Sequence, residues 1–207
     1  MGALLNVFTP ISMFQTIKSI AMANYLIQSN ASINMKIEVF TEGSSTTANR
    51  EDVEYVKDFF KGTFLPVYNL AEKLGKYGDV SVNILSNEYG YLRGSDRVQS
   101  LSDEDNQSGQ KQFSKSLMQA AKQADVVVVL LSKSAFKASV SSQWGQIVSN
   151  IKKESVWCLG ASKSAINSIN IEELQPTVEI IVYERVGVAR ISSKGKKQLL
   201  EIVYDKN

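Results

Sequence analysis

The amino-acid sequence predicts a three-layer, Rossmann-like α/β domain with a mostly parallel sheet of about five strands. Three observations support this prediction. Strand patterns alternate with helical patterns from residue 35 onward, as expected where helices connect parallel strands. Residues 126–131 are all apolar, and a strand without polar alternation is typical of the buried centre of a parallel sheet. The 207 residues are enough for one domain of ordinary size.

Five strands are predicted, at residues 36–41, 80–86, 125–132, 155–159 and 177–183. After the first strand, Asn49 is a candidate N-cap for a helix with apolar residues at three- and four-residue spacing. Gly62 and Pro66 predict a kink or a split in that helix. Gly75 and Gly78 predict its end.

The later helices are recognised by apolar stripes. Polar residues 103–109 are predicted to form a mobile loop before the first of them. A short helix is expected from about Ser162 and a last helix from about Ser192. The two helices expected between this loop and Ser162 have apolar stripes, which consist of Phe113, Leu117, Ala120, Ala121 and Ala124, and of Trp144, Ile147, Val148 and Ile151.

Residues 1–34 are interpreted as an N-terminal extension to a single domain at residues 35–207. Either Met35, directly before the first strand, is the biological start, or the extension adds an amphipathic helix. Polar residues interrupt its apolar residues, so no run approaches the roughly 20 residues of a spanning helix. No basic residue precedes the apolar stretch, which disfavours a signal peptide. We therefore expect a cytoplasmic protein without a membrane span.

The composition excludes several classes of chemistry. The chain has no histidine, which removes histidine triads, histidine bases and histidine metal ligands together. Its one cysteine, Cys158, lies in an apolar run and is predicted to be buried. We expect no metal and no cofactor. A net charge of +2 does not argue for nucleic acid through bulk electrostatics, although it leaves room for a local basic patch.

Small and polar residues follow the predicted strands, where ligands bind in open parallel sheets. Gly43, with Ser44 and Ser45, is predicted to offer backbone N–H groups and hydroxyls to a phosphate, although the P-loop and Gly-x-Gly-x-x-Gly patterns are absent. A plain connector, or a set of helix caps, is the alternative. The candidate ligand-binding residues at these strand ends are Gly43, Ser44, Ser45, Ser132, Lys133 and Ser162.

The richest strand end is the segment 86–97, which holds two glycines, two arginines and two acids. Arginine suits phosphate or carboxylate, and a nearby carboxylate suits acid–base work. An exposed loop with ion pairs is the alternative. The candidate catalytic carboxylates are Glu88, Asp96 and Glu184, and the candidate anion-binding cations are Arg93, Arg97 and Arg185.

The segment Ile84–Val98 contains I-L-S-N-E-Y-G-Y-L followed by S-D-R-V. It resembles the I-L-S-A-K-Y-G-L-L…D-x-x-I segment of YaaA-like proteins, of related domains of unknown function, and of domains that accompany archaeal tRNA-guanine transglycosylases. The resemblance implies a nucleic-acid or nucleobase context. The positions that carry over are Ser86, Tyr89, Gly90 and Asp96.

A second segment, residues 124–136 with Trp144, is similar to the middle of TIR domains, in which a catalytic glutamate follows the tryptophan. Here no acid follows until Glu154, which disfavours a TIR-type NAD glycohydrolase.

The sequence thus predicts an enzyme that acts on a nucleotide, nucleoside or nucleic-acid base by cleaving or exchanging an N-glycosidic bond. A non-catalytic nucleotide- or nucleic-acid-binding module and a TIR-like interaction domain are the alternatives, and the oligomeric state stays open.

Overall fold

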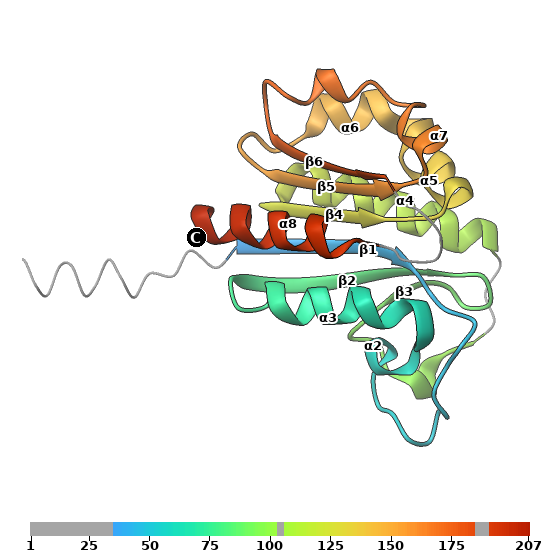
Figure 1. The fold of residues 1–207 in the computed structure, drawn as a ribbon. Helices are drawn as coiled ribbons and strands as arrows, with labels where there is room; N and C mark the ends of the chain where they lie inside the picture. The colour runs from blue at the N-terminus through green and yellow to red at the C-terminus, as the bar shows by residue number, and fades with distance from the viewer. Residues whose placement is uncertain (1–34, 103–105, 185–190) are drawn as a thin grey trace, which may run out of the picture. The chain divides into compact units, whose positions relative to one another are not determined.

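The computed structural model describes residues 35–102, 106–184 and 191–207. Its sheet has the strand order β3-β2-β1-β4-β5-β6 (Figure 1). The five parallel strands are β1 (Met35–Glu42), β2 (Gly78–Ser86), β4 (Val126–Leu130), β5 (Val156–Ala161) and β6 (Glu179–Glu184). The edge strand β3 (Gly90–Arg93) is antiparallel to β2. The predicted Rossmann-like α/β class is confirmed.

Helices cover both faces of the sheet, which makes three layers (Figure 1). One face packs against α3 (Leu65–Leu74) and α8 (Ser193–Lys206). The other face packs against α4 (Asn106–Gln123), α5 (Lys133–Ser139), α6 (Trp144–Asn150) and α7 (Lys163–Ile166). The helix α2 (Val56–Phe59) lies over the β2–β3 hairpin. Single 3₁₀ turns occupy Gly62–Phe64, Val98–Ser100, Ser141–Gln143 and Ile171–Glu173.

The core follows the sequence patterns. Every residue of β4 is fully buried, as its apolar run predicts for a strand covered on both faces. In β1, Ile37 and Val39 face α3 and α8, whereas Phe40 faces α4. The predicted stripe of α4 is buried from Phe113 to Ala124. Among the described residues, no helix has both the length and the apolar character needed to cross a membrane.

The loops and short elements follow the sequence prediction only in part. The strand β3 was not predicted. The helix expected at Asn49 begins only at Val56, because the intervening residues form turns and a bridge to Arg97. The split at Gly62 is confirmed, and this glycine has a φ of +56°. Of the loop predicted at residues 103–109, residues 106–109 belong to α4 instead, and residues 103–105 lie outside the described residues. The two interpretations of residues 1–34 lie outside the described residues.

The order of the parallel strands creates one special position at the carboxyl edge of the sheet. The chain passes from β1 outward to β2 and then returns to β4 on the other side of β1. The connection after β1 runs over one face and the connection after β2 over the other, since α3 and α4 lie on opposite faces. In open α/β sheets, such a switch point is where ligands bind.

Candidate functional site

A cavity of about 350 Å³ lies at this switch point, where β1, β2 and β4 end. This volume is within the range of small-molecule sites. Its walls combine two acids, an amide, several hydroxyls and one aromatic ring. The lining residues are Glu42, Gly43, Ser44, Ser45, Phe60, Leu85, Ser86, Asn87, Glu88 and Ser132. Six of the predicted site residues therefore meet here: Gly43, Ser44, Ser45, Ser86, Glu88 and Ser132.

Glu42 is the best-positioned acid of the cavity, and it was absent from the sequence-based candidates. It is the last residue of β1 and is half-buried. Ser132 donates its backbone N–H to Oε2 at 2.5 Å and its hydroxyl to Oε1 at 2.7 Å. Both carboxylate oxygens are thus held in one orientation. The signal in the sequence was an acid directly after an apolar strand, at the end where parallel sheets bind ligands.

Ser132 connects Glu42 to α5. Its hydroxyl also accepts a hydrogen bond from the N–H of Ala135 at 3.4 Å, which makes Ser132 the N-cap of that helix. The Ser134 hydroxyl lies 3.2 Å away. One side chain therefore serves both the helix and the carboxylate.

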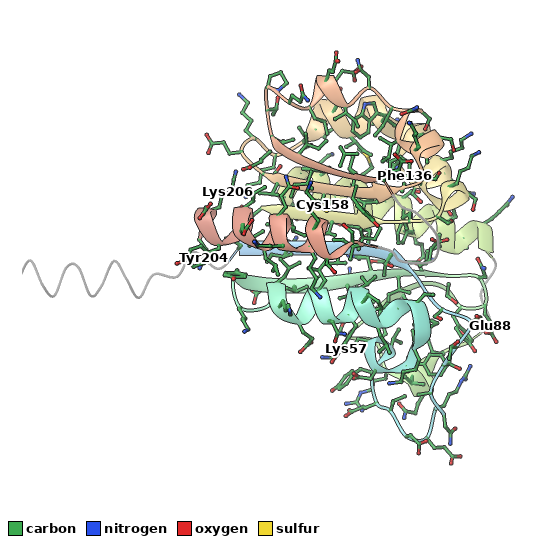
Figure 2. The ribbon with its side chains drawn as sticks, viewed as in Figure 1. Lys57, Glu88, Phe136, Cys158, Tyr204 and Lys206 are labelled. Carbon is green, nitrogen blue, oxygen red and sulfur yellow. The ribbon has the colours of Figure 1, made fainter. Side chains whose placement is uncertain are left out.

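Glu88, the second acid, lies exposed on the turn between β2 and β3 (Figure 2). The hydroxyl of Ser86 shapes this turn, because it accepts hydrogen bonds from the N–H groups of Glu88 and Tyr89, both at 3.2 Å. Ser86 thereby places Glu88 at the mouth of the cavity.

Gly43 has a structural reason to be glycine. Its N–H donates to the Leu85 carbonyl at 2.9 Å, as a continuation of the β1–β2 pairing. A Cβ at this position would lie 2.9 Å from Cε1 of Phe60. The neighbouring Ser44 hydroxyl accepts from the N–H of Thr46 at 3.2 Å. The Gly43 N–H is therefore paired within the sheet, so it is not available for the predicted contact with phosphate.

Three predicted residues lie away from the cavity because the chain reverses after β2. Arg93 pairs with Asn83, three residues before the end of β2, so it lies about 10 Å back from the carboxyl edge. Asp96 accepts a hydrogen bond from the N–H of Arg93 at 2.6 Å. Arg97 forms an exposed ion pair with Glu54 at 2.8 Å. The segment 86–97 is thus a hairpin, and its second half leaves the predicted crevice.

The resemblance motif builds this hairpin. Tyr89 is only 6% exposed, packs edge-on against Phe59, and accepts a hydrogen bond from Arg50 at 3.0 Å. Gly90 has a φ of +67°, a conformation that suits glycine. Tyr89 and Gly90 therefore have packing and backbone roles, and neither lines the cavity.

The remaining candidates lie along the same edge of the sheet but outside the cavity. Lys133 is exposed in the first turn of α5. Ser162 is the N-cap residue of α7, at the end of β5. Glu184 is exposed at the end of β6, two strands away from β4. Arg185 lies outside the described residues.

In the TIR-like segment, the first acid after the tryptophan lies at the other end of the sheet from the cavity. Trp144 is buried at the start of α6, and its Nε1–H donates to the Asn170 carbonyl at 3.1 Å. Glu154 precedes β5 and therefore lies at the amino ends of the parallel strands. The cavity lies at their carboxyl ends, so Glu154 does not reach it.

The lining chemistry limits what the cavity can hold. Among the described residues that line it, none carries a positive charge. Within the described ranges, no group of three or more acids and cysteines is arranged to hold a metal ion. Carboxylates, hydroxyls and an amide are groups that hydrogen-bond to the hydroxyls of a polar ligand.

No family model matches the sequence, and no curated protein matches it.

Proposed function

We propose that the switch-point cavity binds the ribosyl part of a nucleoside or nucleotide, and that the protein cleaves or exchanges its N-glycosidic bond. The observation that carries the proposal is the Glu42 carboxylate, held by two hydrogen bonds from Ser132 inside a hydroxyl-rich cavity. A carboxylate fixed beside a sugar ring is the central group of glycosidic-bond chemistry.

The charge of the lining favours a sugar over a phosphate at this place. Glu42 and Glu88 would repel a phosphate, and the Gly43 N–H is already paired. Ribose hydroxyls, in contrast, can donate to the carboxylates and accept from Ser44 or Asn87. The ring of Phe60 offers an apolar wall for a base or for a sugar face.

The proposed reaction assigns one role to each acid. As the bond from the anomeric carbon to nitrogen breaks, its electron pair leaves with the base, which then takes up a proton. Glu42 stabilises the positive charge that develops at the anomeric carbon. Water, or a second base in an exchange reaction, forms the new bond to this carbon and loses a proton to Glu88.

Turnover of a panel of nucleosides and nucleotides, including NAD, tests the proposal. Base release is measured by chromatography for the wild type, Glu42→Gln and Glu184→Gln. We expect Glu42→Gln to reduce kcat by about 100-fold or more. The matched variant Glu184→Gln changes an exposed acid outside the cavity and should keep the wild-type rate. Equal activity of the two variants would remove Glu42 from the mechanism.

A second candidate function is a non-catalytic binding module. The observation that favours it is that the Glu42–Ser132 hydrogen bonds also tie β1 to α5, which is a structural task. Titration calorimetry with nucleosides distinguishes the two functions. Binding that Glu42→Gln weakens, without release of base by the wild type, supports the module.

A further inference from the structure

A second hollow lies far from the chemistry of Glu42, on the face of the sheet that α3 and α8 cover. It is a groove between these helices with a volume of about 570 Å³. We call it the α3–α8 groove. It is lined by Lys73, Tyr77, Ser193, Lys196, Lys197, Leu200, Glu201 and Tyr204. None of these residues contributes to the switch-point cavity, so a role for the groove is independent of the function proposed for that cavity.

Helical spacing arranges the α8 wall of the groove. Lys196, Leu200 and Tyr204 are four residues apart and therefore lie on one stripe of α8. Leu200 is partly buried and forms an apolar floor. The stripe from Ser193 to Tyr204 covers eleven residue steps, which corresponds to roughly 16 Å along the helix axis.

One part of the groove is lined by the lysines Lys73, Lys196 and Lys197. Lys196 is half-buried, and its pKa is lowered first by this burial and then by the nearby charge of Lys73. Within the described part of the chain, neither Lys73 nor Lys196 forms an ion pair. Lys197, by comparison, lies 3.5 Å from Glu201 in the next turn. Two adjacent lysines without a counter-charge favour an anion between them.

Aromatic rings occupy another part of the groove. Tyr204 is 68% exposed, which is unusual for so large a side chain, and lies at the end of α8 (Figure 2). It contacts Tyr77 edge-on, with 6.4 Å between the ring centroids and 77° between the ring planes. Tyr77 thus supports one edge of the Tyr204 ring, while most of that side chain remains accessible to a planar group.

We propose that the α3–α8 groove binds single-stranded nucleic acid, with phosphates at Lys73 and Lys196 and a base stacked on Tyr204. A basic groove combined with an aromatic ring is the arrangement that binds single strands without sequence preference. At 3.4 Å per nucleotide, the roughly 16 Å stripe matches about five stacked nucleotides. The net charge of only +2 means that the attraction is local to this groove rather than a property of the whole surface.

Fluorescence anisotropy with labelled 12-nucleotide oligo-dT and oligo-rU tests the proposal on the full chain between 50 and 200 mM salt. We expect Lys73→Gln with Lys196→Gln to weaken binding about tenfold or more. The slope of log K against log salt should fall in magnitude by about 1.4, since each lost phosphate contact removes about 0.7. Tyr204→Ser should cost about tenfold through lost stacking.

The matched control is Lys111→Gln with Lys115→Gln, which removes two exposed lysines from α4 on the opposite face of the sheet. It should leave the affinity within about twofold of the wild type. Four results would overturn the proposal: no binding at 50 mM salt, equal losses in both double variants, no effect of Tyr204→Ser, or equally tight binding of an acidic peptide of similar length. None of these results bears on nucleoside turnover by Glu42.

Discussion

The backbones of Gly90 and Gly109 lie so close together that a Cβ atom at Gly109 would be 2.4 Å from the Cα of Gly90. Gly90 begins β3 and Gly109 lies in the first turns of α4. Their contact fixes the β2–β3 hairpin against the helix that leads to β4. Because Ser86 and Glu88 lie on the turn of this hairpin, the glycine pair also positions one wall of the switch-point cavity.

Gly109→Ala is expected to lower the free energy of unfolding by about 2 kcal/mol, because the added methyl group overlaps backbone that has no room to move. Gly145→Ala, in α6, is the matched control, since a Cβ there meets nothing within 4 Å. It should leave stability unchanged or raise it by up to about 1 kcal/mol. Urea unfolding followed by circular dichroism measures both. Equal effects of the two substitutions would contradict the close contact.

Asp125 is expected to make the free energy of unfolding depend on pH in the acidic range. Burial by itself raises its pKa, but the Lys152 ammonium at 2.5 Å and the Lys36 N–H at 2.8 Å outweigh burial and lower the pKa below its usual value. A lowered folded-state pKa stabilises the protein above the unfolded pKa of about 3.9, and this contribution is lost as the pH falls through the folded value.

Asp125→Asn should therefore cost on the order of 1 kcal/mol at pH 7, and the difference from the wild type should shrink as the pH falls below about 4. Urea titrations between pH 7 and pH 3 measure the difference. Asp205→Asn, at an exposed position near the end of α8, is the control and should stay within about 0.5 kcal/mol of the wild type at pH 7. A difference for Asp125→Asn that does not change with pH would argue against the ion pair.

Cys158 is expected to be unreactive in the folded protein. It is fully buried in β5, and burial raises its pKa to about 12. The thiolate is the reactive form, so at pH 8 both access and ionisation are lacking. Titration with Ellman's reagent should detect no thiol in buffer and one thiol per chain in urea, with Cys158→Ala as the blank. Rapid reaction of the native protein would show that β5 opens.

Most strands and helices were predictable because the spacing of apolar residues along each element shows which of its faces is buried. The apolar run of β4 and the stripe of α4 correspond to buried surfaces in the structure. The edge strand β3 was missed because four residues with alternating character look like a turn segment. Its pairing with β2 depends on the turn at Ser86 and on the close approach of Gly109.

The site was predictable in part for the same reason. The rule that ligands bind at the carboxyl ends of parallel strands correctly brought Ser86, Glu88 and Ser132 together around the loop after β1. It misplaced Arg93 and Asp96, because they were treated as residues that continue beyond a strand end when the chain in fact turns back.

The sequence alone determined that this protein is an α/β domain, because apolar periodicity predicts its parallel strands and most of its helices. It also predicted hydroxyl residues at the carboxyl edge of the sheet. Only the tertiary structure decided that Glu42 and Ser132, 90 residues apart, join in one cavity, and that Lys73 and Lys196 share a groove with Tyr204. The physical reason is that periodicity reports which side of an element is buried. Which residues then become neighbours depends on strand order and on the packing of helices from distant parts of the chain.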